Sequence, residues 1–334
     1  MRYRLLLPCL LIACVDEPAA DAESSTETTT SGDGDGDGDG DGDGDGDGDG
    51  DGDGDGDGDG DGDGDGDGDS TPGCNGHLEL CERPYDQVVF PGTHNAHAAS
   101  SEGFSQFNAN QPHGIPQQLE DGVRVMLIDT YYDETNPDTI VLCHGPCALG
   151  STPHLEVLGA IVEFLSANPS EVLTLIYEDH VAPEDLALDY QATGAIDLVY
   201  THTSGTPWPT LGEMIEANTR LVVTAEQGSP PPPWHHNIWE LGWDTPYGPQ
   251  DPAELSCALN RGSTDNDLFL VNHWVNSDIG LPSLEDAEVV NQYEFLLTRA
   301  QQCWTLWDHP PNFLVVDFYD RGDLFAVVDT LNGF

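Results

Sequence analysis

The chain has 334 residues, of which 62 are acidic and only 8 are basic, so its formal net charge is −54. This charge excludes nucleic-acid binding as a function class, because affinity for a phosphate backbone depends on basic side chains. It also argues against tight adsorption to an anionic lipid surface. All the basic residues are arginines, and lysine is absent.

The first fourteen residues read MRYRLLLPCLLIAC, with arginines before a short apolar run. The run is too short to span a bilayer, so residues 1–13 are predicted to be a signal peptide. Leu11 to Cys14 resembles a bacterial lipobox, in which the cysteine is lipidated and becomes the mature N-terminus. We therefore expect an exported lipoprotein, anchored through Cys14 at a bacterial cell envelope or surface. An ordinary secreted protein is the alternative.

Residues 14–73 show no apolar periodicity and contain an alternating Asp-Gly tract from residue 32 to residue 69, which holds 19 acids. Such a segment cannot bury enough apolar surface to offset its chain entropy. We expect a disordered acidic linker that holds the following domain away from its anchor. A loose calcium-binding repeat is the alternative, but no spacing in the tract fixes the geometry of a calcium site.

Six cysteines follow the tract, and an even number in an exported chain predicts disulfides, with 15 connectivities available. Proximity in the sequence favours three pairs. Zinc is disfavoured because no CxxC pair recurs at ligand spacing. The expected pairs are Cys74–Cys81, Cys143–Cys147 and Cys257–Cys303.

Residues 74–334 alternate short apolar runs with helical patterns, as parallel sheets with crossover helices do. A helix is expected after Ser151-Thr152-Pro153, with Leu155, Leu158, Val162 and Leu165 on one face and its end at Asn168-Pro169. We predict one α/β domain, a TIM-like (β/α)₈ barrel that includes distorted forms. The expected strands are 88–90, 123–128, 139–142, 172–177, 221–223, 268–271 and 313–316, and the other helices 211–217, 284–302 and 323–331.

Two histidines stand where expected strands end, His94 after the first and His144 after the third. On a barrel, both would face the same mouth. Histidine titrates near pH 7, so such a pair suits general-base and general-acid roles in opening a phosphodiester. His97 either forms an HxxH metal pair with His94 or supports the loop, and His273 is a candidate for the pocket rim.

Four ordered motifs carry a family resemblance: residues 91–95 (PGTHN), 122–129 (GVRVMLID), 142–145 (LCHG) and 312–319 (NFLVVDFY). Together they resemble the phosphatidylinositol-specific phospholipase C X-domain superfamily, specifically its secreted bacterial branch. The resemblance implies a TIM-like barrel that cleaves phospholipid diesters. It matches His94 to the general base, His144 to the general acid and Asp317 to the carboxylate that orients His94.

The resemblance also bears on a metal. Metal-independent bacterial members carry an arginine after the second strand, where this chain has Asp129. Calcium-dependent members instead use an asparagine and acidic residues, which Asn95, Asp129 and Glu178 match. Leu127 stands where a further glutamate is expected. The resemblance therefore implies a weak Ca²⁺ site, with Mg²⁺ as the alternative, and Arg124 is a secondary candidate for binding the phosphate.

The predicted function is that of a phosphoric diester hydrolase acting on a phospholipid or phosphoinositol substrate. One alternative is a sphingomyelinase D-like phospholipase, which would release a different product. The other is a catalytically silent surface lipoprotein that binds a head group. Retention of both histidines and Asp317 argues against a silent domain, whereas Leu127 argues for one. The expected partners are the substrate and the membrane that holds the lipid anchor, and the sequence indicates no protein partner.

Overall fold

The computed structural model describes residues 73–228 and 230–334. The predicted signal peptide, the Cys14 lipidation site and the Asp-Gly tract lie outside these residues. Within the described ranges, no helix is both long enough and apolar enough to cross a membrane.

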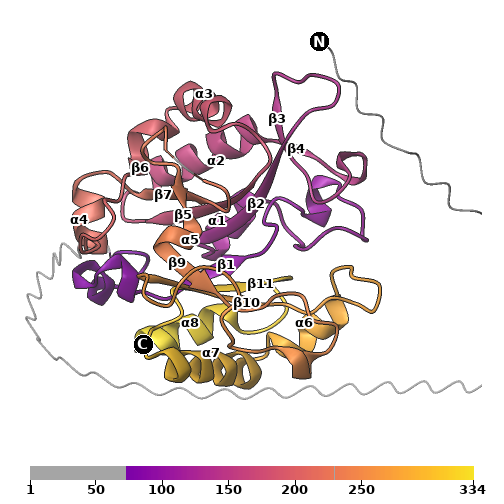
Figure 1. The fold of residues 1–334 in the computed structure, drawn as a ribbon, viewed down its shortest axis with the longest axis vertical. Coiled ribbons are helices and arrows are strands. Elements are labelled where there is room, and N and C mark those ends of the chain that lie inside the picture. Colours follow the sequence, from indigo (N-terminus) through magenta and orange to yellow (C-terminus); the bar gives the residue numbers. More distant parts are fainter. Residues whose placement is uncertain (1–72, 229) are drawn as a thin grey trace, which may run out of the picture. The chain divides into compact units, whose positions relative to one another are not determined.

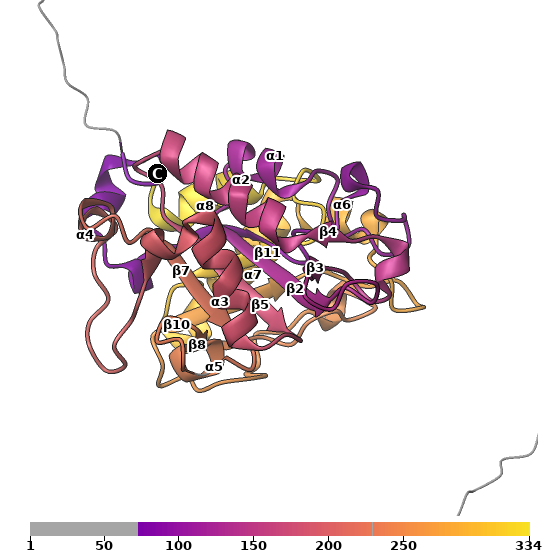
Figure 2. The same ribbon diagram turned by 90° about the horizontal axis from the view of Figure 1, so that it is seen from above.

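A curled, mainly parallel sheet forms the centre of the domain, with helices packed outside it (Figures 1 and 2). The α/β class and the TIM-like architecture are therefore confirmed. The end strands of the main path, β6 and β9, do not pair with each other in the described part of the chain. In spatial order the path is β6 (Val199–Tyr200), β7 (Leu221–Ala225), β5 (Leu173–Asp179), β2 (Val125–Tyr132), β1 (Phe90–Thr93), β11 (Phe313–Val316), β10 (Leu268–His273) and β9 (Gly242–Asp244).

Three short strands lie off this path, and one of them corrects the sequence prediction. The third apolar run is strand β3, and it pairs antiparallel with β2, with Thr130 opposite Leu142. It is thus the arm of a hairpin and not a barrel strand, because the 7 residues between β2 and β3 are too few for a crossover. The off-path strands are β3 (Ile140–Leu142), β4 (Thr152–Pro153) and β8 (His236–Asn237).

The helices differ from the sequence prediction in two places. The predicted helix 284–302 is two helices, α6 and α7, separated at Asn291 and Gln292. Leu155 was placed on the buried face of α2, but it is 46% exposed, whereas Leu158 and Leu165 are buried. The helices are α1 (Ile115–Asp121), α2 (His154–Ala167), α3 (Pro183–Thr193), α4 (Leu211–Glu216), α5 (Ile238–Leu241), α6 (Leu284–Val290), α7 (Tyr293–Trp307) and α8 (Leu324–Asn332).

Alternate residues of each strand enter two separate cores. On β11, Leu314 and Val316 pack outward in the core that contains helix residues, whereas Phe313 and Val315 pack inside the curl. Successive strand side chains point to opposite faces, so this alternation sets which side chains can reach the interior. Inside the curl, Tyr85 and Trp208 stack with ring centroids 4.8 Å apart. The interior is therefore filled by side chains except at its mouth.

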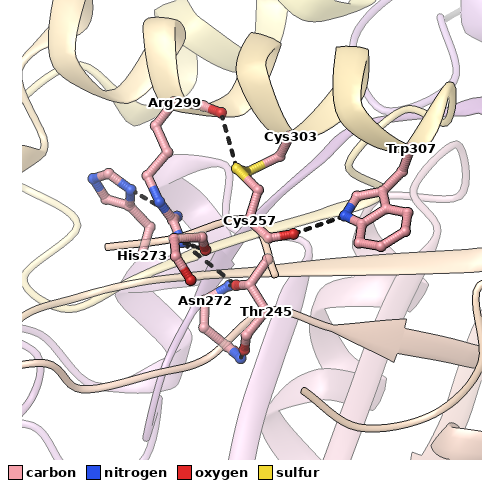
Figure 3. Close-up of a disulfide and its surroundings, with 8 residues drawn as sticks. Thr245, Cys257, Asn272, His273, Arg299, Cys303 and Trp307 are labelled. Atoms are coloured by element: carbon pink, nitrogen blue, oxygen red, sulfur yellow. Dashed lines mark hydrogen bonds between the residues drawn. A yellow bond between two sulfur atoms is a disulfide. The ribbon is translucent and has the colours of Figure 1, made fainter. Parts of the chain in front are cut away.

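All three expected disulfides are present: Cys74–Cys81, Cys143–Cys147 and Cys257–Cys303. The third joins the loop before β10 to helix α7 (Figure 3). Next to it, Arg299 donates to the carbonyl of Ser256 and to Nδ1 of His273. This bridge fixes the loop against the helix layer.

Candidate active site

Most site residues come from the carboxyl ends of parallel strands, which lie at one end of the curl, and they occupy the strand positions that face inward. Phe90 and Val125 face inward, so the positions two and four residues later on each strand face inward as well. Continued past the strand ends, this rule places the following residues at the mouth: His94, Asp129, Glu178, Glu226, Asp244, Asn272, Trp274 and Asp317.

His94 is held in one defined orientation. Its Nδ1 lies 2.9 Å from the Oδ1 of Asp317, whose side chain is 2% exposed while that of His94 is 21% exposed. A carboxylate can only accept here, so the Nδ1 of His94 carries the proton and its Nε2 is the unprotonated nitrogen, which lies 3.2 Å from the Asn95 amide. On one face, Trp274 stacks on the imidazole with ring centroids 3.9 Å apart and planes 8° from parallel.

His144 has the same tautomer for a different reason. Its Nδ1 lies 2.8 Å from the backbone oxygen of Asn108, which can only accept. Nδ1 therefore carries the proton, and Nε2 is again the unprotonated nitrogen. Burial lowers the pKa of His144, and the neighbouring His94 lowers it further. The two imidazole centroids are 6.4 Å apart. Although β3 is a hairpin arm, it still brings His144 beside His94.

A cavity of about 200 Å³ opens beside His94 and contains most of the predicted ligand residues. Asn95, Asp129 and Glu178 line it, and so does Leu127. Asp129 is 7% exposed and directly opposite Glu178 across the β2–β5 pair. Burial raises the pKa of Asp129 well above its usual range, and Glu178 and Glu226 add to this.

Several lining residues were not identified from the sequence. Glu226 and Trp274 follow the strand-parity rule past β7 and β10, so that rule would have found them. Arg261 carries no such signal, because it comes from the loop between β9 and β10. It donates to Asp244 at 2.6 Å and to Glu226 at 2.7 Å, and it lies 4.1 Å over the ring of Trp239. Arg261 therefore connects the end of β9 to the end of β7.

The structure does not bring Arg124 to this cavity. Arg124 precedes β2, at the opposite end of the sheet from Asp129, and lines a different cavity. Its guanidinium donates to Glu171 at 2.7 Å and to the carbonyls of Leu119 and Val123. Arg124 thus has a structural role in joining β2 to its surroundings. In the described residues, Arg261 supplies the basic side chain that lines the site cavity.

Of two further histidines, His273 is placed differently from the sequence expectation, whereas His97 packs within its loop, which was one of the two expectations. His273 does not reach the pocket rim: it is fully buried and bonded to the Val290 carbonyl and to Arg299. His97 is also buried, and neither of its ring nitrogens has a hydrogen-bond partner in the described chain. Since burial lowers the pKa of His97 to about 3, it is a neutral packing residue of the loop.

The side chains that line the cavity determine which metal ion the site fits. Among the described residues, no three His, Cys, Asp or Glu side chains are grouped as a metal-binding set. The candidate set therefore consists of two carboxylates, Asp129 and Glu178, and the amide of Asn95. Glu178 in this structure lies 2.9 Å from Nε2 of His180. These residues fit a weak oxygen-ligand site completed by water or substrate, and they do not form a closed cage.

The Asn95 amide lies between Asp129 and Asn110. With its nitrogen 3.3 Å from the Oδ1 of Asn110, its oxygen faces both oxygens of Asp129 at 3.1 Å. With the amide turned, its nitrogen donates to both oxygens of Asp129 instead. A turned amide or a proton on Asp129 satisfies these groups, so the amide orientation is not evidence for a cation.

Comparison with known proteins decides the family. Residues 80–332 match the model described as PI-PLC X 1. The chain belongs to the PI-PLC X family. It is 26% identical over 279 residues to PI-PLC X domain-containing protein 1 of Arthroderma benhamiae, a match that covers 78% of this chain and 89% of that one.

Other relatives are longer than the match. An uncharacterized secreted protein of Arthroderma benhamiae is 28% identical over 291 residues, which cover 79% of this chain and 64% of that protein. A PI-PLC X domain-containing protein of Arabidopsis thaliana is 28% identical over 284 residues, covering 75% and 63%. This PI-PLC X chain thus spans less than two thirds of the length of these two relatives.

Solved structures support the fold. A phosphatidylinositol-specific phospholipase C from Staphylococcus aureus superposes with a TM-score of 0.57 at 17% identity, covering 76% of this chain and 95% of that one. A mutant of that phospholipase gives a TM-score of 0.53 at 15% identity, covering 71% and 88%. At these identities the likeness concerns the fold alone.

Proposed function

We propose that this PI-PLC X chain is a phosphoric diester hydrolase that cleaves the head-group ester of a phospholipid or phosphoinositol. The supporting observation is the pair of histidines with unprotonated Nε2 atoms and ring centroids 6.4 Å apart, one of them held by a buried carboxylate. His94 acts as the general base that removes a proton from the attacking hydroxyl. His144, when protonated, acts as the general acid that returns a proton to the leaving oxygen.

Asp317 supports this reaction by its charge and position. During turnover His94 becomes an imidazolium, and the buried carboxylate at 2.9 Å stabilises that charge while fixing the ring. The parallel stack of Trp274 adds a cation–π contribution to the same charged state.

The test is a panel of phospholipids incubated with the purified full-length chain, with product analysis. A cyclic inositol phosphate would support the phospholipase C reaction, whereas release of the free head group would support the sphingomyelinase D-like alternative. Absence of turnover on every substrate, with an intact fold, would favour the silent head-group binder.

We further propose that Ca²⁺ binds between Asn95, Asp129 and Glu178, with Mg²⁺ as the alternative ion. The cavity wall carries the carboxyl groups of Glu178 and Glu226 against Arg261, with the buried Asp129 beside them, so a phosphate anion entering alone would meet net negative charge. A bound divalent cation would offset that charge and stabilise the transition state.

Calcium binding has a test that does not need turnover. Titration calorimetry and thermal shift of the full-length chain should show weak Ca²⁺ binding, near the 10⁻⁴–10⁻³ M range of extracellular sites. Leu127→Glu adds a carboxylate and should tighten it, whereas Asp129→Asn should remove it. Equal Ca²⁺ affinity in the wild type and Asp129→Asn would contradict the site. Full activity in chelator would show that the reaction does not require it.

We also propose that the protein is an exported lipoprotein. This proposal is supported by the N-terminal sequence and by the relative described as secreted. The match to fungal and plant relatives leaves the secreted bacterial branch a proposal as well. Two or more acyl chains anchor a protein stably, so the mature chain should begin at Cys14 and partition into detergent. Cys14→Ser should release it into the aqueous phase.

A further inference from the structure

A buried segment of the loop after β1, Asn108–Gln111, contacts both histidines and Asp317. Three of its residues each form hydrogen bonds with a different part of the site. Those parts come from the ends of three separate strands. Asn108, Asn110 and Gln111 are all buried, with exposures of 5%, 1% and 0%. Nothing in the proposed proton transfers uses these side chains, so their contacts need another explanation.

Asn108 and His144 are joined by two bonds in opposite directions. His144 donates from Nδ1 to the Asn108 carbonyl at 2.8 Å, and Asn108 donates from Nδ2 to the His144 carbonyl at 3.0 Å. Ser105 donates to the Asn108 side chain at 2.7 Å and so holds it in place. The ring and backbone of His144 are therefore fixed to the same residue.

Asn110 performs the corresponding task at Asp317. Its Nδ2 donates to both carboxylate oxygens at 3.0 Å. It also lies 3.3 Å from Nδ1 of His94, but both nitrogens carry hydrogen there, so Asn110 acts on His94 only through the carboxylate. Gln111 donates to the carbonyls of His94 at 2.8 Å and Val316 at 3.1 Å, which ties the end of β1 to the end of β11. The carboxylate is thus oriented so that it faces His94.

We infer that Asn108–Gln111 is a positioning element that fixes the tautomers of both histidines, through Asn110 for His94 and through Asn108 for His144. The reacting roles of the two histidines rest on the proposed function, whereas their tautomers do not. A rigid set of hydrogen bonds around site residues is what holds reacting groups within the narrow range of productive geometry.

The test combines NMR with kinetics. The full-length chain, labelled with ¹⁵N histidine, should show both histidines as the Nδ1–H tautomer in the pH range where the imidazoles are neutral. In Asn110→Ala, His94 should become a mixture of tautomers while His144 keeps its signal. In Asn108→Ala, His144 should change and His94 should not. The Asn108 effect should be smaller, because its carbonyl remains.

Kinetics give the second readout. Asn110→Ala should lower kcat by about 10- to 100-fold with little change in KM, as is typical when a residue that orients a site side chain through hydrogen bonds is removed, because Asn110 holds the carboxylate that orients His94. Asn110→Ser keeps one donor and should fall between the wild type and Asn110→Ala. It also serves if the alanine variant does not fold. Asn136→Ala, which removes an exposed bond to Thr139, is the matched control.

Unchanged tautomers at both histidines in all site variants would overturn the inference, as would an equal change in Asn136→Ala. The tautomer result holds whether or not a tested substrate is turned over. Wild-type tautomers as described, with no activity on any phosphodiester, would therefore refute the proposed function and leave the positioning element supported.

Discussion

The imidazole of His94 is held on three sides: Asp317 bonds Nδ1, Trp274 covers one face, and Asn95 lies 3.2 Å from Nε2. His144 has no carboxylate within its hydrogen bonds and relies on the Asn108 carbonyl. The two residues therefore differ in what stabilises their charged forms. This difference suits one to accept a proton and the other to give one away.

Replacing either histidine by alanine should lower phosphodiesterase activity by about 10²- to 10⁴-fold, the usual contribution of a general acid or base. Circular dichroism and the melting temperature should be close to those of the wild type, because both histidines are only partly buried. His113→Ala, an exposed histidine of the same loop, is the control. An equally large loss in His113→Ala would mean that the base is wrongly assigned.

The pH dependence follows from the lowered pKa of His144. The acid must be protonated, so activity falls as the pH rises through this pKa. Since an ordinary histidine titrates near about pH 6.5, the alkaline limb of kcat/KM should lie below that value. A profile of rate against pH measures it. An alkaline limb above about pH 7 would contradict the assignment of His144 as the acid.

Trp274 should matter through its stack on His94. Trp274→Leu removes the aromatic face and should lower kcat by about 2- to 13-fold, the range expected for an aromatic pair worth 0.5–1.5 kcal/mol. Trp274→Phe keeps a face and should lose less. Comparable kinetics for the leucine and phenylalanine variants would show that the stack is not used.

Among the structural elements, two disulfides should have different effects. One should mainly affect stability, and the other should mainly affect the geometry of the site. Cys143–Cys147 closes a loop of sequence separation 4 around His144, whereas Cys257–Cys303 spans 46. In the chain-entropy model, the shorter loop contributes about 2 kcal/mol and the longer about 4 kcal/mol. Serine replacement of Cys257 and Cys303 should therefore cost more stability than replacement of Cys143 and Cys147.

The short bridge should instead affect activity, because it stiffens the loop that presents His144. Denaturant unfolding and kcat, measured on both double variants, test this contrast. A loss of activity that simply tracks the loss of stability in both variants would argue against a role for the short bridge in positioning His144.

At the scale of the whole molecule, a neutral buried histidine limits stability in acid. Burial and the cation Arg299 lower the pKa of His273 to about 3, and its Nδ1 accepts from Arg299 (Figure 3). The unfolded chain binds this proton near about pH 6.5, whereas the folded chain does not. Stability is therefore complete above about pH 6.5 and is lost as the pH falls from there toward 3.

The loss attributable to His273 should approach about 1.4 kcal/mol per pH unit. Urea unfolding from pH 7 to pH 4 measures it. His273→Gln keeps an acceptor for Arg299 and a donor for the Val290 carbonyl but cannot titrate, so its stability should depend less on pH. Identical pH dependence in both proteins would rule His273 out as the cause.

From the sequence alone, the α/β class, most of the apolar strands and the disulfide pairs could be predicted, because they depend on local patterns and on proximity along the chain. His94 and His144 were identified because each follows an apolar run, and the family resemblance added Asp129, Glu178 and Asp317. Neither kind of signal needs knowledge of which strands are neighbours.

Which residues from distant parts of the chain come into contact depends on the tertiary structure. It placed Arg124 at the far end and Arg261 in the cavity, made β3 a hairpin arm, and brought Asn108 and Asn110 to the histidines. These contacts depend on strand order, on chain direction and on the paths of irregular loops. A loop residue has no period that fixes its facing, so its partners are set by packing across the whole domain.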